Sequence, residues 1–235
     1  MRRFCTALVF LCLFAPAAVA VAEEDEDDSS ETYTFEEETR LIFEARSTGF
    51  NFAHSSFDAL TDYNAHPTGH FGVGYGLSEW VPGLRGYVYY AGTGLFPDRF
   101  GGELDMRWRR DMFLLAVDYG PEFWGFLRPS VRGGLGYALQ TLDVWTDSTN
   151  KRDTAHDPVA FGSVGLEAYT SRWLPGSARA GLMTELGYLL QTPANFDGVQ
   201  TRREDDEWDR QPADYGNLHT SGLFWSLGIG LQFDL

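Results

Sequence analysis

The chain has 235 residues, of which 15% are aromatic and 26 are glycine, and its formal net charge at pH 7 is −16. So negative a charge argues against nucleic acid as a partner. After residue 22 no stretch approaches 18 consecutive apolar residues, so the sequence predicts no transmembrane helix there.

Residues 1–22 have the pattern of a cleaved secretory signal peptide. Two arginines near its start are followed by the apolar segment Ala7 to Phe14, which is too short to span a membrane as a helix, and then by small residues. Because Cys5 and Cys12 both lie inside this segment, the mature chain is expected to have no disulfide and no thiol chemistry.

Residues 23–38 are strongly acidic. Six acids in a row, Glu23 to Asp28, are followed by two serines and further glutamates. Like charges at this density repel one another, so this segment is predicted to be a disordered N-terminal tail. Residues 39–235 are left to form one folded domain.

The first part of that domain contains three candidate strands. Thr39 to Phe52 alternates imperfectly, so a helix is an alternative to a strand there. Gly69 to Glu79 alternates clearly between large apolar residues and glycines. After a Trp-Val-Pro-Gly turn, Leu84 to Gly94 is its predicted hairpin partner. It carries tyrosines suited to an aromatic girdle at a membrane interface: Tyr87, Tyr89 and Tyr90.

The middle of the chain, Arg99 to Gly120, changes phase. Its large apolar residues occupy even positions up to Trp108 and odd positions from Phe113 onward, so the pattern slips at Arg109–Asp111. The slip indicates either a tight turn between two strands or a β-bulge in one long strand.

Three more strands are predicted farther along, at Leu127 to Leu142, Val159 to Thr170 and Ser177 to Thr192. Asp143 to Asp157 is predicted to be a polar loop, and Pro193 to Leu218 a long acidic loop outside the cell. Alternation along these strands turns four charged side chains to the face opposite the large apolar residues: Arg132, Glu167, Arg179 and Glu185.

The last stretch, Ser221 to Leu235, alternates most strictly. Every odd position from Leu223 onward is large and apolar, whereas the even positions hold mainly glycine and polar residues. Only a strand places alternate residues on opposite faces. A face of glycine and polar groups suits the lumen of a membrane barrel that has lipid outside. Fifteen residues also exceed the roughly 9–11 that a tilted spanning strand needs.

The signal peptide, the final alternating strand and the asymmetry between short turns and long loops resemble the small outer-membrane β-barrel proteins of Gram-negative bacteria. The resemblance covers Thr39 to Leu235. It implies an all-β, antiparallel transmembrane barrel in the bacterial outer membrane. Its partners would be the lipid bilayer, lipopolysaccharide and the outer-membrane assembly machinery, with the extracellular ligand unknown. Members usually end in an aromatic residue, whereas this chain ends Phe233-Asp234-Leu235.

The strand count follows from topology. Barrels of this kind have an even number of strands with both termini on the periplasmic side. One bulged strand between Arg99 and Gly120 gives eight strands. It also places two similar turns, Ser78 to Gly83 and Ser171 to Gly176, on the same side. We therefore predict eight strands, with ten as the alternative.

We expect a structural or narrow-pore role without catalysis, cofactor or metal. One alternative is a lipid A-modifying, deacylase-like barrel enzyme, because His54 and Ser56 have the spacing of a histidine that activates a serine. Another alternative is a soluble secreted barrel that binds an apolar ligand in its interior. The remaining histidines lack metal-ligand spacing, and Glu204 to Glu207 lacks the spaced ligands of a calcium loop.

Overall fold

The computed structural model describes residues 33–34, 40–52, 66–77, 80–93, 96–100, 104–145, 150–170, 178–196 and 217–234. The signal peptide predicted at residues 1–22 lies outside these residues, as does most of the acidic tail. Within the described part of the chain, no helix is long and apolar enough to cross a membrane.

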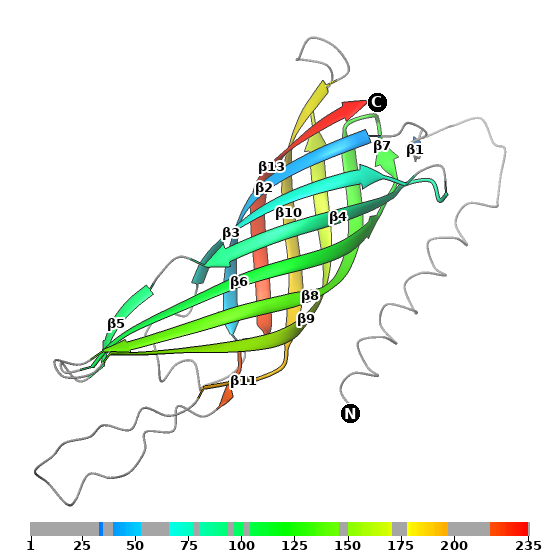
Figure 1. The fold of residues 1–235 in the computed structure, drawn as a ribbon. Coiled ribbons are helices and arrows are strands. Elements are labelled where there is room, and N and C mark those ends of the chain that lie inside the picture. The colour runs from blue at the N-terminus through cyan, green and yellow to red at the C-terminus, as the bar shows by residue number, and fades with distance from the viewer. Residues whose placement is uncertain are drawn as a thin grey trace, which may run out of the picture.

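Eight long antiparallel strands form a closed barrel (Figure 1). Each pairs with its neighbours along the chain, and the last strand pairs with the first over thirteen residue positions. The predicted all-β fold class and the count of eight are therefore confirmed. The strands are β2 (Arg40–Phe52), β3 (His66–Gly76), β4 (Leu84–Thr93), β6 (Leu104–Tyr119), β8 (Leu127–Trp145), β9 (Asn150–Tyr169), β10 (Ala178–Gln191) and β13 (Gly222–Asp234).

Five shorter strands lie at the two ends of the barrel. β1 (Tyr33–Thr34) pairs with β7 (Glu122–Phe123) at one end. At the other end β5 (Phe96–Phe100) pairs with β6, and β11 (Ala194–Asn195) pairs with β12 (Asn217–Leu218). Part of the segment predicted to be a disordered tail, β1, is thus a strand.

Side-chain exposure follows the alternation predicted from the sequence. In β13 the odd residues are exposed, with Leu227 59% accessible, while most even residues are buried. The same outward row of large apolar side chains continues around the wall, for example Phe71, Leu115 and Leu182. An apolar exterior that surrounds a polar interior is the pattern of a barrel in lipid.

Short turns connect strands at the end of the barrel where β13 finishes (Figure 1). The β3–β4 turn is closed by a hydrogen bond from Leu77 N–H to the Leu84 carbonyl at 2.8 Å. The β7–β8 turn has positive φ at Trp124 and Gly125, 52° and 71°, as both central positions of a type I′ turn require. The second predicted Trp-Pro-Gly turn lies outside the described residues. Its flanking strands, β9 and β10, reach this same end.

The predicted bulge in β6 is wrong, although β6 is a single strand as expected. Its pairing with β8 runs one-to-one from Tyr119 opposite Val131 to Asp105 opposite Trp145, with no offset at Arg109–Asp111. The backbone therefore keeps its phase while the apolar residues change face. The change reflects a different environment for the outer half of the strand, as described below.

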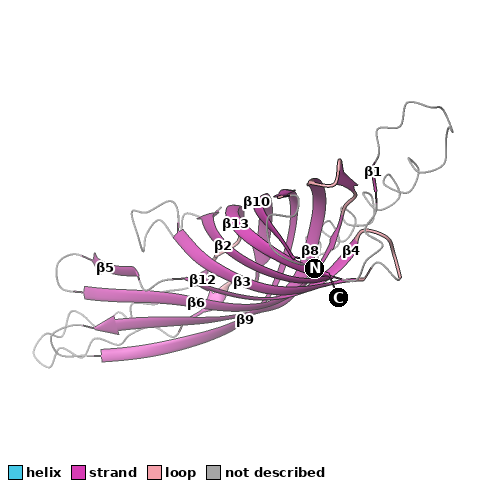
Figure 2. Cartoon of the chain, turned by 90° about the horizontal axis from the view of Figure 1, so that it is seen from above, coloured by secondary structure: helices cyan, strands magenta, loops and turns pink. Residues whose placement is uncertain are grey.

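The prediction of a polar loop at Asp143–Asp157 is also wrong. β8 continues to Trp145 and β9 begins at Asn150, and the two pair along their whole length. Pairing of β9 with β10 ends at Val159 opposite Gln191, so the outer part of β9 leaves the barrel wall. β5 and the outer parts of β6 (residues 104–111), β8 (139–145) and β9 (150–157) form a projecting sheet beyond the barrel (Figure 2).

Tyr87 and Tyr89 were predicted for an interfacial girdle, and this is wrong for both. They lie inside the barrel at 3% and 4% exposure, and only Tyr90 faces outward. The reason lies on the neighbouring strand, where Gly72 and Gly74 face inward. A Cβ at either glycine would overlap a tyrosine ring, so the glycines make the room that the two rings fill.

Candidate functional site

The interior near the short-turn end holds a cluster of charged side chains centred on Arg132 of β8. Its guanidinium lies 3.3 Å from Glu44, 3.1 Å from Asp118, 3.4 Å from Glu167 and 3.7 Å from Glu185. These acids come from four different strands, β2, β6, β9 and β10. Arg132 thus links strands that face one another across the lumen.

Three further arginines complete this charged cluster. Arg46 contacts Glu44 at 2.5 Å and also contacts Glu185. Arg85 and Arg128 both contact Glu167, at 2.9 and 3.3 Å, and Arg128 also contacts Asp118. The cluster therefore contains four arginines and four carboxylates, and its formal charges cancel. The members are Glu44, Arg46, Arg85, Asp118, Arg128, Arg132, Glu167 and Glu185.

Hydroxyl and backbone groups take up further hydrogen-bonding capacity of the cluster. Tyr89 donates to Glu44 at 2.7 Å, and Tyr169 donates to Glu167 at 2.6 Å. Arg128 donates to the carbonyls of Gly120 and Gly83 at 3.2 and 3.0 Å. Buried charges are tolerated when they are paired and hydrogen-bonded, and this cluster meets both conditions.

A second, smaller group of ion pairs lies nearer the short-turn mouth. Arg40 contacts Asp234 at 3.0 Å and Glu122 at 3.4 Å, and Arg179 contacts the other oxygen of Glu122 at 2.8 Å. Glu122 belongs to β7, whose partner is β1. The β6–β8 connection therefore places a carboxylate between arginines of β2 and β10 at this end of the barrel.

Between the charged cluster and the projecting sheet, the lumen is filled by aromatic and aliphatic side chains. Tyr87 and Tyr89 stack at 5.3 Å between ring centroids, and the Arg132 guanidinium lies 4.6 Å from the centre of the Tyr87 ring. Phe50 and Phe224 pack at 5.7 Å beside them. A cavity lined by members of the charged cluster has a volume of about 10 Å³, roughly the space of one water molecule.

The end of the lumen that faces the projecting sheet is closed by a polar layer and then an apolar one. Gln140 donates to Asp157 at 2.9 Å and accepts from Trp108 at 3.1 Å. Beyond them, residues of β6, β8 and β9 pack with residues of β11 and β12 and the segments beside them. This outer apolar cluster consists of Trp108, Leu142, Val144, Ala155, Ala194, Phe196 and Leu218.

The four charged residues predicted to face the lumen lie in two places. Arg132, Glu167 and Glu185 are all buried in the charged cluster, whereas Arg179 lies at the short-turn mouth with its side chain 21% exposed. Sequence reasoning missed the other five members of the cluster, Glu44, Arg46, Arg85, Asp118 and Arg128. Alternation from outward Val117 and Val131 would have identified Asp118 and Arg128.

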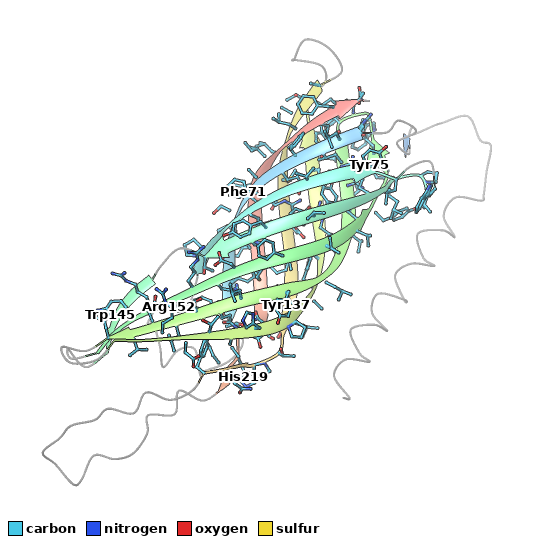
Figure 3. The ribbon with its side chains drawn as sticks, in the orientation of Figure 1. Phe71, Tyr75, Tyr137, Trp145, Arg152 and His219 are labelled. Carbon is cyan, nitrogen blue, oxygen red and sulfur yellow. The ribbon has the colours of Figure 1, made fainter. Side chains whose placement is uncertain are left out.

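Two ion pairs lie on the outer face of the projecting sheet. Arg109 contacts Asp111 at 2.7 Å, and Arg152 contacts Asp143 at 2.5 Å. Hydrogen bonding to Asp143 raises the pKa of the Arg152 guanidinium above its ordinary value, so this side chain stays charged at every physiological pH. Figure 3 shows Trp145 and Arg152 near the tip of this sheet, while Phe71 and Tyr75 lie on the wall of the barrel.

Neither catalytic nor metal-binding candidates can be placed. His54 and Ser56, the pair considered for a lipid-modifying enzyme, lie outside the described residues. Among the described residues, no group of three or more histidine, cysteine, aspartate or glutamate side chains could hold a metal ion.

Solved structures share this fold. A major outer membrane protein from Thermus thermophilus matches at 13% identity and a TM-score of 0.51, covering 83% of this chain and 99% of that chain. The N-terminal β-barrel domain of Pseudomonas aeruginosa OprF matches at 14% identity and a TM-score of 0.42, covering 86% of this chain and 100% of that one. Neisserial surface protein A matches at 11% identity and a TM-score of 0.42, covering 84% and 97%.

No protein-family model matches the chain, and no curated protein sequence matches it. At such low identities the structural matches concern the fold alone. The chain therefore has the fold of the small outer-membrane β-barrels.

Proposed function

We propose that this protein is a non-conducting outer-membrane barrel, a structural anchor that holds the projecting sheet outside the cell. The observation that carries the proposal is the filled lumen. Arg132 contacts four carboxylates from four strands, the aromatic layer lies above them, and the outer apolar cluster closes the far end. Eight strands leave an interior only wide enough for side chains to fill.

The distribution of polarity supports a membrane location. The barrel wall presents large apolar side chains outward, and its interior holds ion pairs. A soluble barrel that stores an apolar ligand would have the opposite arrangement, with an apolar cavity inside and polar groups outside. The apolar exterior and the ion-paired interior therefore favour a location in the membrane over a soluble, ligand-binding barrel.

The orientation follows from the positions of the short turns. In bacterial barrels short turns lie on the periplasmic side and longer loops outside. This orientation places the β3–β4 turn in the periplasm and the projecting sheet outside. The proposed partners are the outer-membrane lipids, lipopolysaccharide among them, and the assembly machinery that inserts such barrels.

The test is conductance in planar lipid bilayers, combined with fractionation of cells. We expect the full-length protein to co-purify with outer membranes and to give no steady current. A stable conductance would show an open pathway and contradict the structural role. Recovery of the protein as a detergent-free soluble species from the periplasm would contradict the membrane location.

A further inference from the structure

Among the arginines whose side chains the structure describes, those that face outward lie on the projecting sheet. Of the ten arginines whose side chains the structure describes, seven face the lumen or its mouths, namely Arg40, Arg46, Arg85, Arg110, Arg128, Arg132 and Arg179. The other three, Arg107, Arg109 and Arg152, are exposed on the outer face of the projecting sheet. Within the described side chains of a chain whose net charge is −16, these three arginines are therefore a local feature.

Strand register places these arginines in two adjacent rows, with Asp143 between the two arginines of the outer row. Arg109, Thr141 and Thr154 form one row across β6, β8 and β9. The next row outward along the same strands is Arg107, Asp143 and Arg152. We call these rows, with Asp111 and Trp145, the outer patch.

The outer patch is continuous with the apolar wall of the barrel. Along β6, the outward residue Phe113 lies four positions from Arg109, about 13 Å at the usual rise of a strand. Phe113, Tyr137 and Pro158 form the row where the apolar exterior ends on these three strands. A lipid whose acyl chains lie against this row must place its headgroup against the outer patch.

The side chains of the outer patch are held in place by their neighbours. The Arg107 guanidinium lies 4.7 Å from the centre of the Trp145 ring. Asp111 accepts hydrogen bonds from Arg109 at 3.0 Å and from Tyr90 at 2.6 Å. Arg152 donates two hydrogen bonds to Asp143, and its side chain is 70% exposed. A guanidinium carries five N–H donors, so each arginine keeps donors directed to its surroundings.

We propose that the outer patch binds the phosphorylated sugar headgroup of an outer-leaflet glycolipid. Arginine matches phosphate geometry with two parallel hydrogen bonds, and the nearby carboxylates and Trp145 suit sugar hydroxyls and sugar faces. The inference rests on the proposed membrane location and names the site at which the lipid is recognised. Contact with Phe113 and Tyr137 below the patch selects a lipid over a free phosphate.

The test is native mass spectrometry of the full chain in detergent micelles titrated with lipid A. We expect bisphosphorylated lipid A to bind about tenfold or more tightly than the same glycolipid without its phosphates. The variant Arg107→Gln/Arg109→Gln/Arg152→Gln should lose this preference. The control Arg202→Gln/Arg203→Gln/Arg210→Gln removes the same charge from the sequence between β11 and β12 and should keep it.

Four outcomes would overturn the inference. The first is equal binding of the two lipids by the unchanged protein. The second is an unchanged preference in a patch variant that still shows the heat-induced gel shift of a folded barrel. The third is displacement of lipid A by inorganic phosphate, which would identify a free-anion site. The fourth is loss of binding in EDTA, which would assign the binding to a cation bridge through Asp111 and Asp143. Two other results, a protein that is soluble without detergent or one that gives a steady conductance, would instead count against the proposed function. Both come from experiments separate from the lipid titration, so the two failures can be told apart.

Discussion

Strands β6, β8 and β9 pass through two regions of the molecule and reverse their polarity between them. In the barrel wall these strands direct Leu115, Leu135 and Val164 outward and charged residues such as Arg132 inward. In the projecting sheet they direct Arg109 and Arg152 outward, whereas Trp108, Leu142 and Ala155 pack inward. The register between the strands does not change at the transition.

The difference shows that the surroundings, rather than the backbone, decide which face of a strand is apolar. Lipid surrounds the barrel wall in the proposed orientation, so ion pairs are confined to the interior. In the same proposed orientation water would surround the projecting sheet, and its apolar residues pack against β11 and β12 while Arg109 and Arg152 lie outside. The boundary between the two patterns marks the proposed edge of the bilayer.

The largest effect is expected from Arg132→Ala. The substitution leaves Glu44, Asp118, Glu167 and Glu185 close together without their shared cation. Removing one partner of a buried ion pair typically costs about 3–5 kcal/mol of unfolding free energy. Urea unfolding in detergent should show this loss. Arg152→Ala, which removes an exposed arginine from the projecting sheet, should leave the midpoint unchanged. Equal midpoints for both variants would indicate that water screens the charged cluster.

A smaller effect is expected from charge placed on the outer wall. Leu227→Arg puts a guanidinium at the centre of the outward row of β13, where it should cost about 2–4 kcal/mol in a bilayer. Thr154→Arg places the same side chain on the outer face of the projecting sheet and should cost almost nothing. Unfolding of both variants in lipid vesicles measures the difference. A tolerated arginine at position 227 would mean that this row does not face lipid.

The smallest effect concerns the fit between glycines and tyrosines. Gly72→Ala introduces a methyl group that overlaps the ring of Tyr89, which is held by its hydrogen bond to Glu44. Overpacking of this kind costs about 1–3 kcal/mol. Gly162→Ala is the matched control, because a Cβ there meets nothing within 4 Å. Thermal unfolding should separate the two variants, and equal midpoints would show that Tyr89 can move.

The sequence reveals the barrel wall well and the projecting sheet poorly. In β13 the two faces differ so strongly that alternation alone predicts the strand and its lipid-facing side. In β6 the apolar residues change face at Arg109–Asp111. Sequence analysis interprets this change as a bulge, although the strand pairs with β8 without one. The outer parts of β8 and β9 carry polar residues on the face toward water, so their sequence resembles a loop.

Only some members of the charged cluster could be predicted, because the prediction depends on how clearly the two faces of each strand differ. Arg132, Glu167 and Glu185 stand in strands whose outward face is clearly apolar, and so their inward direction could be predicted. Arg85 stands in a strand where three tyrosines obscure the phase. The partners themselves could not be predicted, because Arg132 and Glu44 are 88 residues apart and meet only when the barrel closes.

Spin labels placed singly along β8 test the reversal of polarity most directly. Cys5 and Cys12 are the chain's only cysteines, so single labels can be introduced once both are removed. In lipid vesicles, labels at positions 131, 135 and 137 should collide with oxygen more than with a water-soluble nickel complex. Labels at 141 and 143 should show the reverse, and labels at 142 and 144 should be shielded from both. Lipid exposure at 141 and 143, or water exposure at 142 and 144, would contradict the change of polarity along this strand.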